Sequence, residues 1–421
     1  MSSTPSALPP DDSDPAAPSG RPAALHLAVA LDGAGWHPAA WREPVSRPRE
    51  LLTAGYWADL VTEAERGLLD FVTIEDSLGL QSSHPTEPDD RTDQVRGRLD
   101  AVLVAARVAP LTSRIGLVPT VVTTHTEPFH LSKAIATLDY VSTGRAGVRV
   151  QVSARQNEAA HFGRRTIPRF GPEDLESRAV REVVLDLFDE AADYVEVLRR
   201  LWDSWEDDAE IRDAATGRFV DRGKLHHIDF EGRHFGVKGP SITPRPPQGQ
   251  PPVSALAHEG AAGAPFRLLG RSADIGYVTP HDSAGAASIV AAVRAARAEA
   301  GRADQPLRLF GDLVVFLDEA PGAAAARRDR LDGLAGRPYR SDARIFTGTS
   351  AQLADLLQEL GGSGLTGFRL RPAVVGHDLP AITRGLVPEL QRRGVFRRSY
   401  EADTLRGLLG LARPASRYAT A

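Results

Sequence analysis

The chain has 421 residues, of which 42% are hydrophobic and 25% are charged, a composition typical of globular proteins and unlike that of disordered ones. Lysine and arginine total 50 against 55 acidic residues, so the net charge of −5 argues against nucleic-acid binding. Cysteine is absent, which excludes disulfides, cysteine-bound metals and thiol nucleophiles. No segment approaches the roughly 20 apolar residues of a membrane span, so we expect a soluble, cytoplasmic protein without membrane contacts.

Short apolar segments rich in Val, Ile, Leu and Phe alternate with longer segments of helical periodicity. The predicted strands cover residues 25–31, 69–75, 115–122, 146–152, 252–256, 275–278, 307–316 and 367–371. The predicted helices cover residues 54–67, 99–108, 128–138, 189–204, 263–271, 284–301, 351–360 and 381–393. Eight successive strand–helix units predict an α/β fold, and their number favours a (β/α)8 TIM barrel over the alternative of a doubly wound open sheet.

Three segments depart from this alternation. Residues 1–23 contain six prolines, and we expect a disordered N-terminal tail before a barrel domain at 24–412 and a short tail at 413–421. Residues 154–188 follow the fourth strand and residues 205–250 follow the fourth helix. Long insertions of this kind are often lids or binding segments, so both are candidate lids.

Standard catalytic motifs are missing: the chain has no P-loop, no G-x-G-x-x-G after its first strand, no H-E-x-x-H and no G-x-S-x-G. We interpret His226, His227 and His234 as scattered loop residues and predict no metal site. In a barrel, chemistry occurs at the carboxyl ends of the strands. Polar residues follow most of these ends and indicate a site for an anionic or polar ligand, such as a phosphate-bearing cofactor; they are Asp32, Glu75, Asp76, Thr120, Thr123, His125, Ser153, Arg155, His258, Thr279, His281 and Arg371.

Six segments in the same order resemble a known family. They are WHPAAWREP (36–44), YWADLVTEAERGLLDFVTIEDSLGLQ (56–81), RIGLVPTVVTTHTEPFHLSKAIATLDYVSTGRAGVRV (114–150), DEAADYVEVLRRLWDSWEDDA (189–209), HHIDFEGRHFGVKGPSITPRPPQGQPP (226–252) and GLVPELQRRGVFRRSYEADTLRGLLGL (385–411). Together they resemble the luciferase-like flavin-dependent monooxygenases, in the nitrilotriacetate and desulfurisation branch. The resemblance covers residues from about 25 to about 411.

The resemblance implies a (β/α)8 barrel that binds reduced FMN supplied by a separate NAD(P)H-dependent flavin reductase. The reduced flavin would activate O₂, and the protein would orient a small organic substrate and exclude water. Many relatives are homodimers, and we expect the same here. Arg42 and His125 lie near the expected mouth of the site and favour an anionic or polar substrate, whose identity cannot be read from the sequence.

Five positions correspond to flavin contacts in the family. Asp76 stands where the family has the acidic residue that ends its second strand, although a turn or helix cap would also explain it. Thr120 matches a flavin-contacting threonine, or is a β-branched residue suited to a strand. Ser153 ends the counterpart of the family's W-N-[IV]-V-T-S strand, here VRVQVS. Phe188 would stack on the flavin, and backbone N–H groups near Gly260 would hold its phosphate.

Other positions depart from the family pattern. Val184 and Phe188 replace a histidine and a tyrosine, and Ala261 and Ala262 follow His258–Gly260 where the family has a polar Q-A-G-x-S segment. Arg155, Arg164 or Arg165 would have to compensate for the lost polar contacts to the flavin. Arg149 replaces asparagine and is either a ligand contact or, as we expect, an outward-facing strand residue. An F420-dependent oxidoreductase and a non-catalytic partner or ligand-binding subunit therefore remain alternatives.

Overall fold

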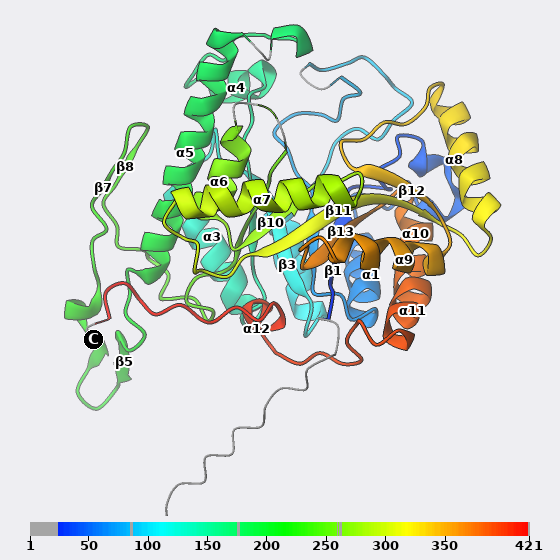
Figure 1. Cartoon of the computed structure of the whole chain (residues 1–421). Helices are drawn as coiled ribbons and strands as arrows, with labels where there is room; N and C mark the ends of the chain where they lie inside the picture. The colour runs from blue at the N-terminus through cyan, green and yellow to red at the C-terminus, as the bar shows by residue number, and fades with distance from the viewer. Residues whose placement is uncertain (1–23, 85–86, 175–176, 259, 261–262, 420–421) are drawn as a thin grey trace, which may run out of the picture.

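The computed structural model describes residues 24–419 except 85–86, 175–176, 259 and 261–262. Eight parallel strands form a closed barrel, in which β10 pairs with β9 on one side and with β11 on the other (Figure 1). In barrel order they are β1 (His26–Leu31), β2 (Phe71–Ile74), β3 (Gly116–Val122), β4 (Val148–Gln151), β9 (Val253–Leu256), β10 (Ile275–Val278), β11 (Arg308–Leu317) and β13 (Gly367–Pro372). The predicted TIM barrel is confirmed, and the open sheet is excluded.

Helices follow the strands and cover the outside of the barrel (Figure 1). Their apolar faces form one core with the outward-facing strand residues, as amphipathic helices on a parallel sheet require. The main helices are α1 (Ala54–Arg66), α2 (Ala101–Val108), α3 (Pro128–Val141), α5 (Arg178–Asp203), α6 (Ala264–Ser272), α7 (Ser283–Glu299), α8 (Pro321–Ala335), α9 (Ser350–Gly361), α10 (Val375–Ala381) and α11 (Val387–Arg392). Within the described residues, no helix is both long enough and apolar enough to cross a membrane.

Two elements between the last barrel strands escaped the sequence prediction. Helix α8 follows β11 directly, and β12 (Arg344–Gly348) then pairs in parallel with the second half of β11, at residues Leu313–Leu317. The first half of β11 pairs with β10 instead. The seventh strand–helix unit thus has two helices and an extra strand. The prediction that the helix at 351–360 directly follows the strand at 307–316 is therefore wrong.

The two insertions are more structured than expected. Residues 154–188 contain α4 (Gln156–Phe162) and the first turns of α5, which begins at Arg178 and not at 189. Residues 205–250 form two small hairpins, and the second of them projects from the barrel beside α5 (Figure 1). Their strands are β5 (Glu210–Asp213), β6 (Arg218–Val220), β7 (Phe230–Glu231) and β8 (Gly236–Val237). The short helical turns in the chain are η1 (Ala40–Arg42), η2 (Pro44–Ser46), η3 (Ala109–Leu111), η4 (Pro172–Asp174), η5 (Arg222–Lys224) and the π-helical turn η7 (Ile382–Leu386).

The amino-terminal end of the barrel is closed by apolar side chains. Phe71, Tyr277 and Phe310 point inward from three strands and pack with Leu405 and Leu409 of the C-terminal segment, which includes α12 (Leu405–Leu408). This plug lies opposite the carboxyl ends of the strands, so the barrel can open only at that other end. The packed amino-terminal end of the barrel therefore supports a site at the carboxyl ends of the strands.

Asp274, the residue directly before β10, is predicted to make the free energy of unfolding depend on pH in the acidic range. Its carboxylate accepts from Arg199 Nη2 at 2.8 Å and from the backbone N–H of Val253 at 2.9 Å. Burial alone would raise the pKa of Asp274, but Arg199 and Arg406 lower it to about 2. Because the folded pKa lies below the unfolded value, stabilisation of about 2 kcal/mol is present above pH 4 and is lost as the pH falls towards 2.

Urea unfolding of the native protein and of Asp274→Asn between pH 7 and pH 2.5 measures this contribution. We expect the difference in unfolding free energy between the two proteins to shrink as the pH falls below 4. A difference that stays constant across this range would contradict the prediction.

Candidate active site

A cavity of about 800 Å³ opens at the carboxyl ends of the barrel strands. Its volume is in the usual range for ligand pockets of about 300–1,000 Å³. The loop after β1 contributes Trp36 and His37, and β4 contributes Arg149 and Gln151. The segment between α8 and β12 adds another wall, formed by Arg337, Pro338, Tyr339, Arg340 and Asp342. This cavity therefore lies where barrel enzymes bind their ligands.

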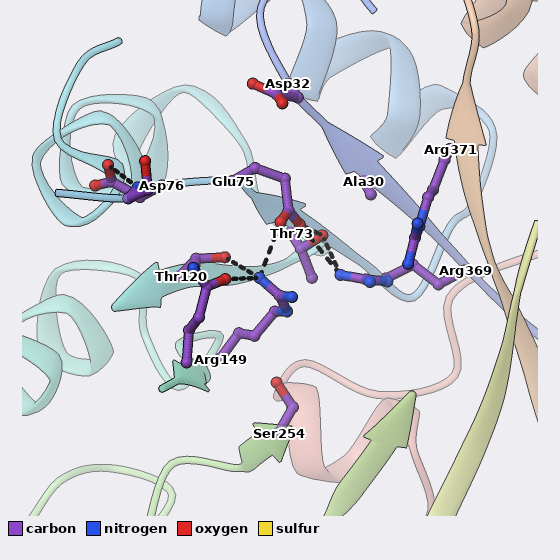
Figure 2. A network of polar contacts seen from close by, with 12 residues as sticks. Ala30, Asp32, Thr73, Glu75, Asp76, Thr120, Arg149, Ser254, Arg369 and Arg371 are labelled. Atoms are coloured by element: carbon purple, nitrogen blue, oxygen red, sulfur yellow. Dashed lines mark hydrogen bonds and ion pairs between the residues drawn. The ribbon is translucent and has the colours of Figure 1, made fainter. Parts of the chain in front are cut away.

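The floor of this cavity is an alternating chain of charged side chains. Arg149 Nη1 donates to Glu75 Oε2 at 2.9 Å and to Thr120 Oγ1 at 3.1 Å, as Figure 2 shows. On its other side, Glu75 Oε1 accepts from Arg369 Nη1 at 3.1 Å. Arg369 is completely buried and lies beside Tyr277, with its guanidinium carbon 4.0 Å from the ring centroid.

The chain of charges continues through Asp312 to the wall of the cavity. Asp312 accepts from Arg369 Nε at 2.9 Å and from Arg371 Nε at 3.0 Å. Arg371 Nη1 then donates to Asp342 Oδ1 at 2.6 Å, and the Arg371 guanidinium lies over the ring of Trp36. Three arginines and three carboxylates thus alternate across the barrel, and their charges balance. We call these six residues the ion chain: Arg149, Glu75, Arg369, Asp312, Arg371 and Asp342.

Strand alternation places these charges inside the barrel. In β13, Arg369 and Arg371 face the interior while Phe368 and Leu370 pack against the outer core. In β4, Arg149 and Gln151 face inward in the same way. The expectation that Arg149 faces outward is therefore wrong. A charged residue in a strand that is buried on both faces was the available signal, since such a residue needs an interior partner.

The carboxylates of the ion chain are held in their charged form. Burial alone would raise the pKa of Glu75, but Arg149 and Arg369 keep it below its usual value. Asp312 follows the same pattern, because Arg369 and Arg371 outweigh its burial and lower its pKa. The floor is therefore ionised at neutral pH and is rigidly hydrogen-bonded.

His37 links the wall formed by residues 337–342 to the loop after β1. Its Nδ1 accepts from the backbone N–H of Ala39 at 3.1 Å, so Nε2 carries the proton and donates to Asp332 Oδ1 at 3.0 Å. The same Asp332 oxygen accepts from the backbone N–H of Tyr339 at 2.7 Å. Burial lowers the pKa of His37, although Asp332 acts in the opposite direction, and the lowered pKa keeps the imidazole neutral. The Asp332 carboxylate thus fastens this wall to His37 in the loop after β1.

Asp76 is the one predicted cofactor contact that lines the large cavity. Its carboxylate accepts from the backbone N–H groups of Ala101 at 2.9 Å and Ser77 at 2.7 Å. Ala101 is the first residue of α2, so Asp76 also stabilises the start of that helix. Burial raises the pKa of Asp76 above its usual value, although these two hydrogen bonds act to lower it. Both interpretations of this residue are thus compatible with its position.

The other four predicted contacts do not line the large cavity. Thr120 is buried beside Arg149 on the neighbouring strand and is bonded to it. The Ser153 hydroxyl accepts from the N–H of Arg155 at 3.3 Å beside a smaller cavity of about 220 Å³. Phe188 is half-buried on α5, and Gly260 is exposed with a φ of 106°. Their flavin contacts remain predictions, and Glu259, Ala261 and Ala262 lie outside the described residues.

Several other predicted polar residues are engaged elsewhere. Arg164 pairs with Glu127 and Arg165 with Glu190, whereas Arg155 lines the large cavity. Arg42 and His125 do not line the large cavity: Arg42 donates to Leu334 O, and His125 stacks on Phe162. The three candidate loop histidines have separate partners, which are Glu206 for His226, the carbonyl of Gly239 for His227 and Asp186 for His234.

Comparison with known proteins identifies the family. The profile of the luciferase-like monooxygenases matches residues 36–361. The chain is 29% identical to N-acetyl-S-(2-succino)cysteine monooxygenase of Bacillus subtilis (strain 168), covering 94% of this chain and 98% of the relative. It is also 29% identical to nitrilotriacetate monooxygenase component A of Aminobacter aminovorans, covering 93% and 97%.

Solved structures share the fold. A long-chain alkane monooxygenase superposes with a TM-score of 0.80 at 22% identity, covering 92% of this chain and 95% of that chain. An F420-dependent tetrahydromethanopterin reductase of Methanopyrus kandleri is more distant, with a TM-score of 0.58 at 14% identity and coverage of 87% and 99%. The profile match spans most of the chain, and the chain therefore belongs to the luciferase-like monooxygenase family.

Proposed function

We propose that the 800 Å³ cavity binds reduced FMN and that the protein uses it with O₂ to oxygenate a small organic substrate. The observation that carries this proposal is the position and lining of the cavity, which lies at the carboxyl ends of the strands and has Trp36 and Tyr339 among its lining residues. Bound reduced flavin would supply the activation of O₂. Relatives with monooxygenase names support the reaction class.

The lining of the cavity suits this cofactor. Flat aromatic walls match an isoalloxazine ring, and the ionised floor offers fixed hydrogen-bond donors. Arg155, Arg337 and Arg340 line the same cavity and provide positive charge for a phosphate. Among the described residues, neither Arg337 nor Arg340 has a carboxylate within ion-pair distance, so both are available to an anionic ligand.

The chain's own residues would position the ligands and exclude water. The ion chain holds the floor in one geometry, and the wall of residues 337–342, fastened by His37 and Asp332, covers the side of the cavity. We propose a separate NAD(P)H-dependent flavin reductase as the source of reduced FMN, in keeping with the designation of one relative as component A. A riboflavin lyase structure that contains modified FMN shares the fold at 24% identity, with a TM-score of 0.79.

Anaerobic calorimetric titration with reduced FMN, oxidised FMN and F420 tests the proposal. We expect reduced FMN to bind with a Kd in the micromolar range or below and more tightly than the other two. Preference for F420 would change the reaction to hydride transfer, and failure of all three to bind would overturn the proposal. Asp76→Asn keeps one side-chain oxygen that can accept from the Ala101 N–H at the start of α2, so a drop in flavin affinity without a change in thermal stability would assign Asp76 to the cofactor.

A further inference from the structure

A second cavity of about 260 Å³ adjoins the first. The two communicate through one junction, because eight residues line both of them: Asp32, Gly33, Trp41, Glu75, Gln81, Gln94, Val95 and Arg98. We call the smaller cavity the annex. Away from the junction its walls are largely apolar and include Pro48, Leu51, Leu52, Trp57 and Leu99.

The two tryptophans present only apolar surface to the annex. Trp41 Nε1 donates to the carbonyl of Asp93 at 3.0 Å, and Trp57 Nε1 donates to the carbonyl of Leu51 at 3.0 Å. Because both indole N–H groups are already paired, neither ring requires a polar partner from a ligand. The annex is therefore suited to an apolar group, and its volume fits part of a ligand better than a whole one.

Three buried polar atoms at the junction lack partners among the described residues: Gln81 Oε1, Gln94 Nε2 and Arg98 Nε. The opposite end of each side chain is anchored. Gln81 Nε2 donates to the carbonyl of Gly97 at 3.0 Å, which fixes the orientation of that amide, and Gln94 Oε1 accepts from Ser83 Oγ at 2.9 Å. Arg98 uses its two Nη atoms for Ser77 and Asp32. Buried polar atoms are rarely left unpaired, so this arrangement points to a ligand.

The unpaired atoms comprise one acceptor and two donors, and the charges around them balance. Arg98 is paired with Asp32 at 3.2 Å, and Glu75 is paired with Arg149 at 2.9 Å. A carboxylate at the junction would meet the Gln81 carbonyl oxygen and two existing carboxylates, which disfavours it. A neutral group with both an acceptor and a donor is the chemical complement of this set, and a secondary amide is such a group.

We propose that the annex is the specificity pocket of the enzyme and holds an apolar substituent of the substrate that is joined to a secondary amide. The amide oxygen accepts from Gln94 Nε2 and Arg98 Nε, and the amide N–H donates to Gln81 Oε1. The remainder of the substrate then extends through the junction into the larger cavity. The assignment of this ligand as substrate rests on the proposed function, whereas the binding itself does not.

Calorimetric titration of the full-length protein with three probes of similar shape tests the proposal. N-benzylacetamide carries the amide, benzyl acetate lacks its N–H donor, and 3-phenylpropionate replaces it with a carboxylate. We expect the amide to bind about tenfold more tightly than the ester, as for one hydrogen bond, and the carboxylate to bind more weakly still. Equal affinities for the amide and the ester would overturn the proposal.

Two variants connect this preference to the annex. Gln81→Leu removes the acceptor and should reduce the preference for the amide over the ester to about parity. Gln156→Leu, on α4 beside a different small cavity, is the matched control and should leave the preference unchanged. Leu99→Trp fills the annex and should abolish probe binding while reduced FMN binds within about twofold of the native affinity. Unchanged amide preference in Gln81→Leu would contradict the assignment.

The outcomes separate the two proposals. Loss of both probe and FMN binding in a folded Leu99→Trp variant would place the annex in the flavin site and overturn the present inference alone. If Leu99→Trp does not fold, Leu52→Trp introduces the bulky ring from the exposed edge of the annex and serves the same purpose. Probe binding by a native protein that binds no flavin would overturn the proposed function and leave the amide site in place.

Discussion

Replacing Asp312 with asparagine is expected to lower the free energy of unfolding by about 3–5 kcal/mol. Asp312 is completely buried and is the carboxylate that joins Arg369 to Arg371, both of which are also buried. The asparagine side chain keeps the shape of aspartate and one acceptor oxygen but has no negative charge. Arg369 would then have only the Glu75 carboxylate as an ion-pair partner, and Arg371 only that of Asp342. Breaking a buried pair is costly because the surviving charge has lost contact with water.

Urea unfolding at pH 7 measures this loss, and Asp355→Asn is its matched control. Asp355 also pairs with an arginine, Arg393, at 2.6 Å, but its side chain is 70% exposed. Ion pairs in water contribute little, so the control should change stability by less than about 1 kcal/mol. Similar losses in the two variants would contradict a special role for the buried ion chain.

The Arg149–Glu75 pair is expected to show a coupling energy of about 1–3 kcal/mol in a double-mutant cycle. Glu75→Gln leaves the Arg149 guanidinium without its carboxylate, and Arg149→Gln leaves Glu75 with Arg369 and Thr73 as partners. The double variant removes both charges, so its loss of stability should be smaller than the sum of the two single losses. Urea unfolding of the four proteins gives the coupling.

The exposed Arg47–Glu50 pair provides the comparison cycle, because the same chemistry there is open to solvent. Its coupling should be much smaller than that of the buried pair. Additive losses for Arg149 and Glu75 would mean that the cavity floor is not organised by their pairing. Reduced-FMN titration of the double variant then asks a separate question: a loss of affinity of more than about tenfold in a stably folded variant would indicate that the floor contacts the cofactor.

Local sequence patterns predicted the barrel because they report directly on burial. Alternating apolar strands and amphipathic helices are visible in one sequence, and the capping box that Thr349 and Gln352 form at the start of α9 is a local pattern of the same kind. Helix α8 was missed because its Ala- and Arg-rich sequence buries only four side chains and has little periodicity. Strand β12 is five residues long, and its place depends on the free half of β11.

The sequence by itself therefore determined the fold class, the family resemblance and the end of the barrel where the site lies. Only the tertiary structure decided that Arg149 faces inward, because the direction of a strand residue depends on register and on a distant partner such as Glu75. The same holds for the annex, whose walls come from residues 32–33, 41–57, 75 and 81–99. Burial and pairing of polar atoms are relations between segments far apart in the chain: a local pattern signals that a buried charge needs a partner, but it does not identify that partner.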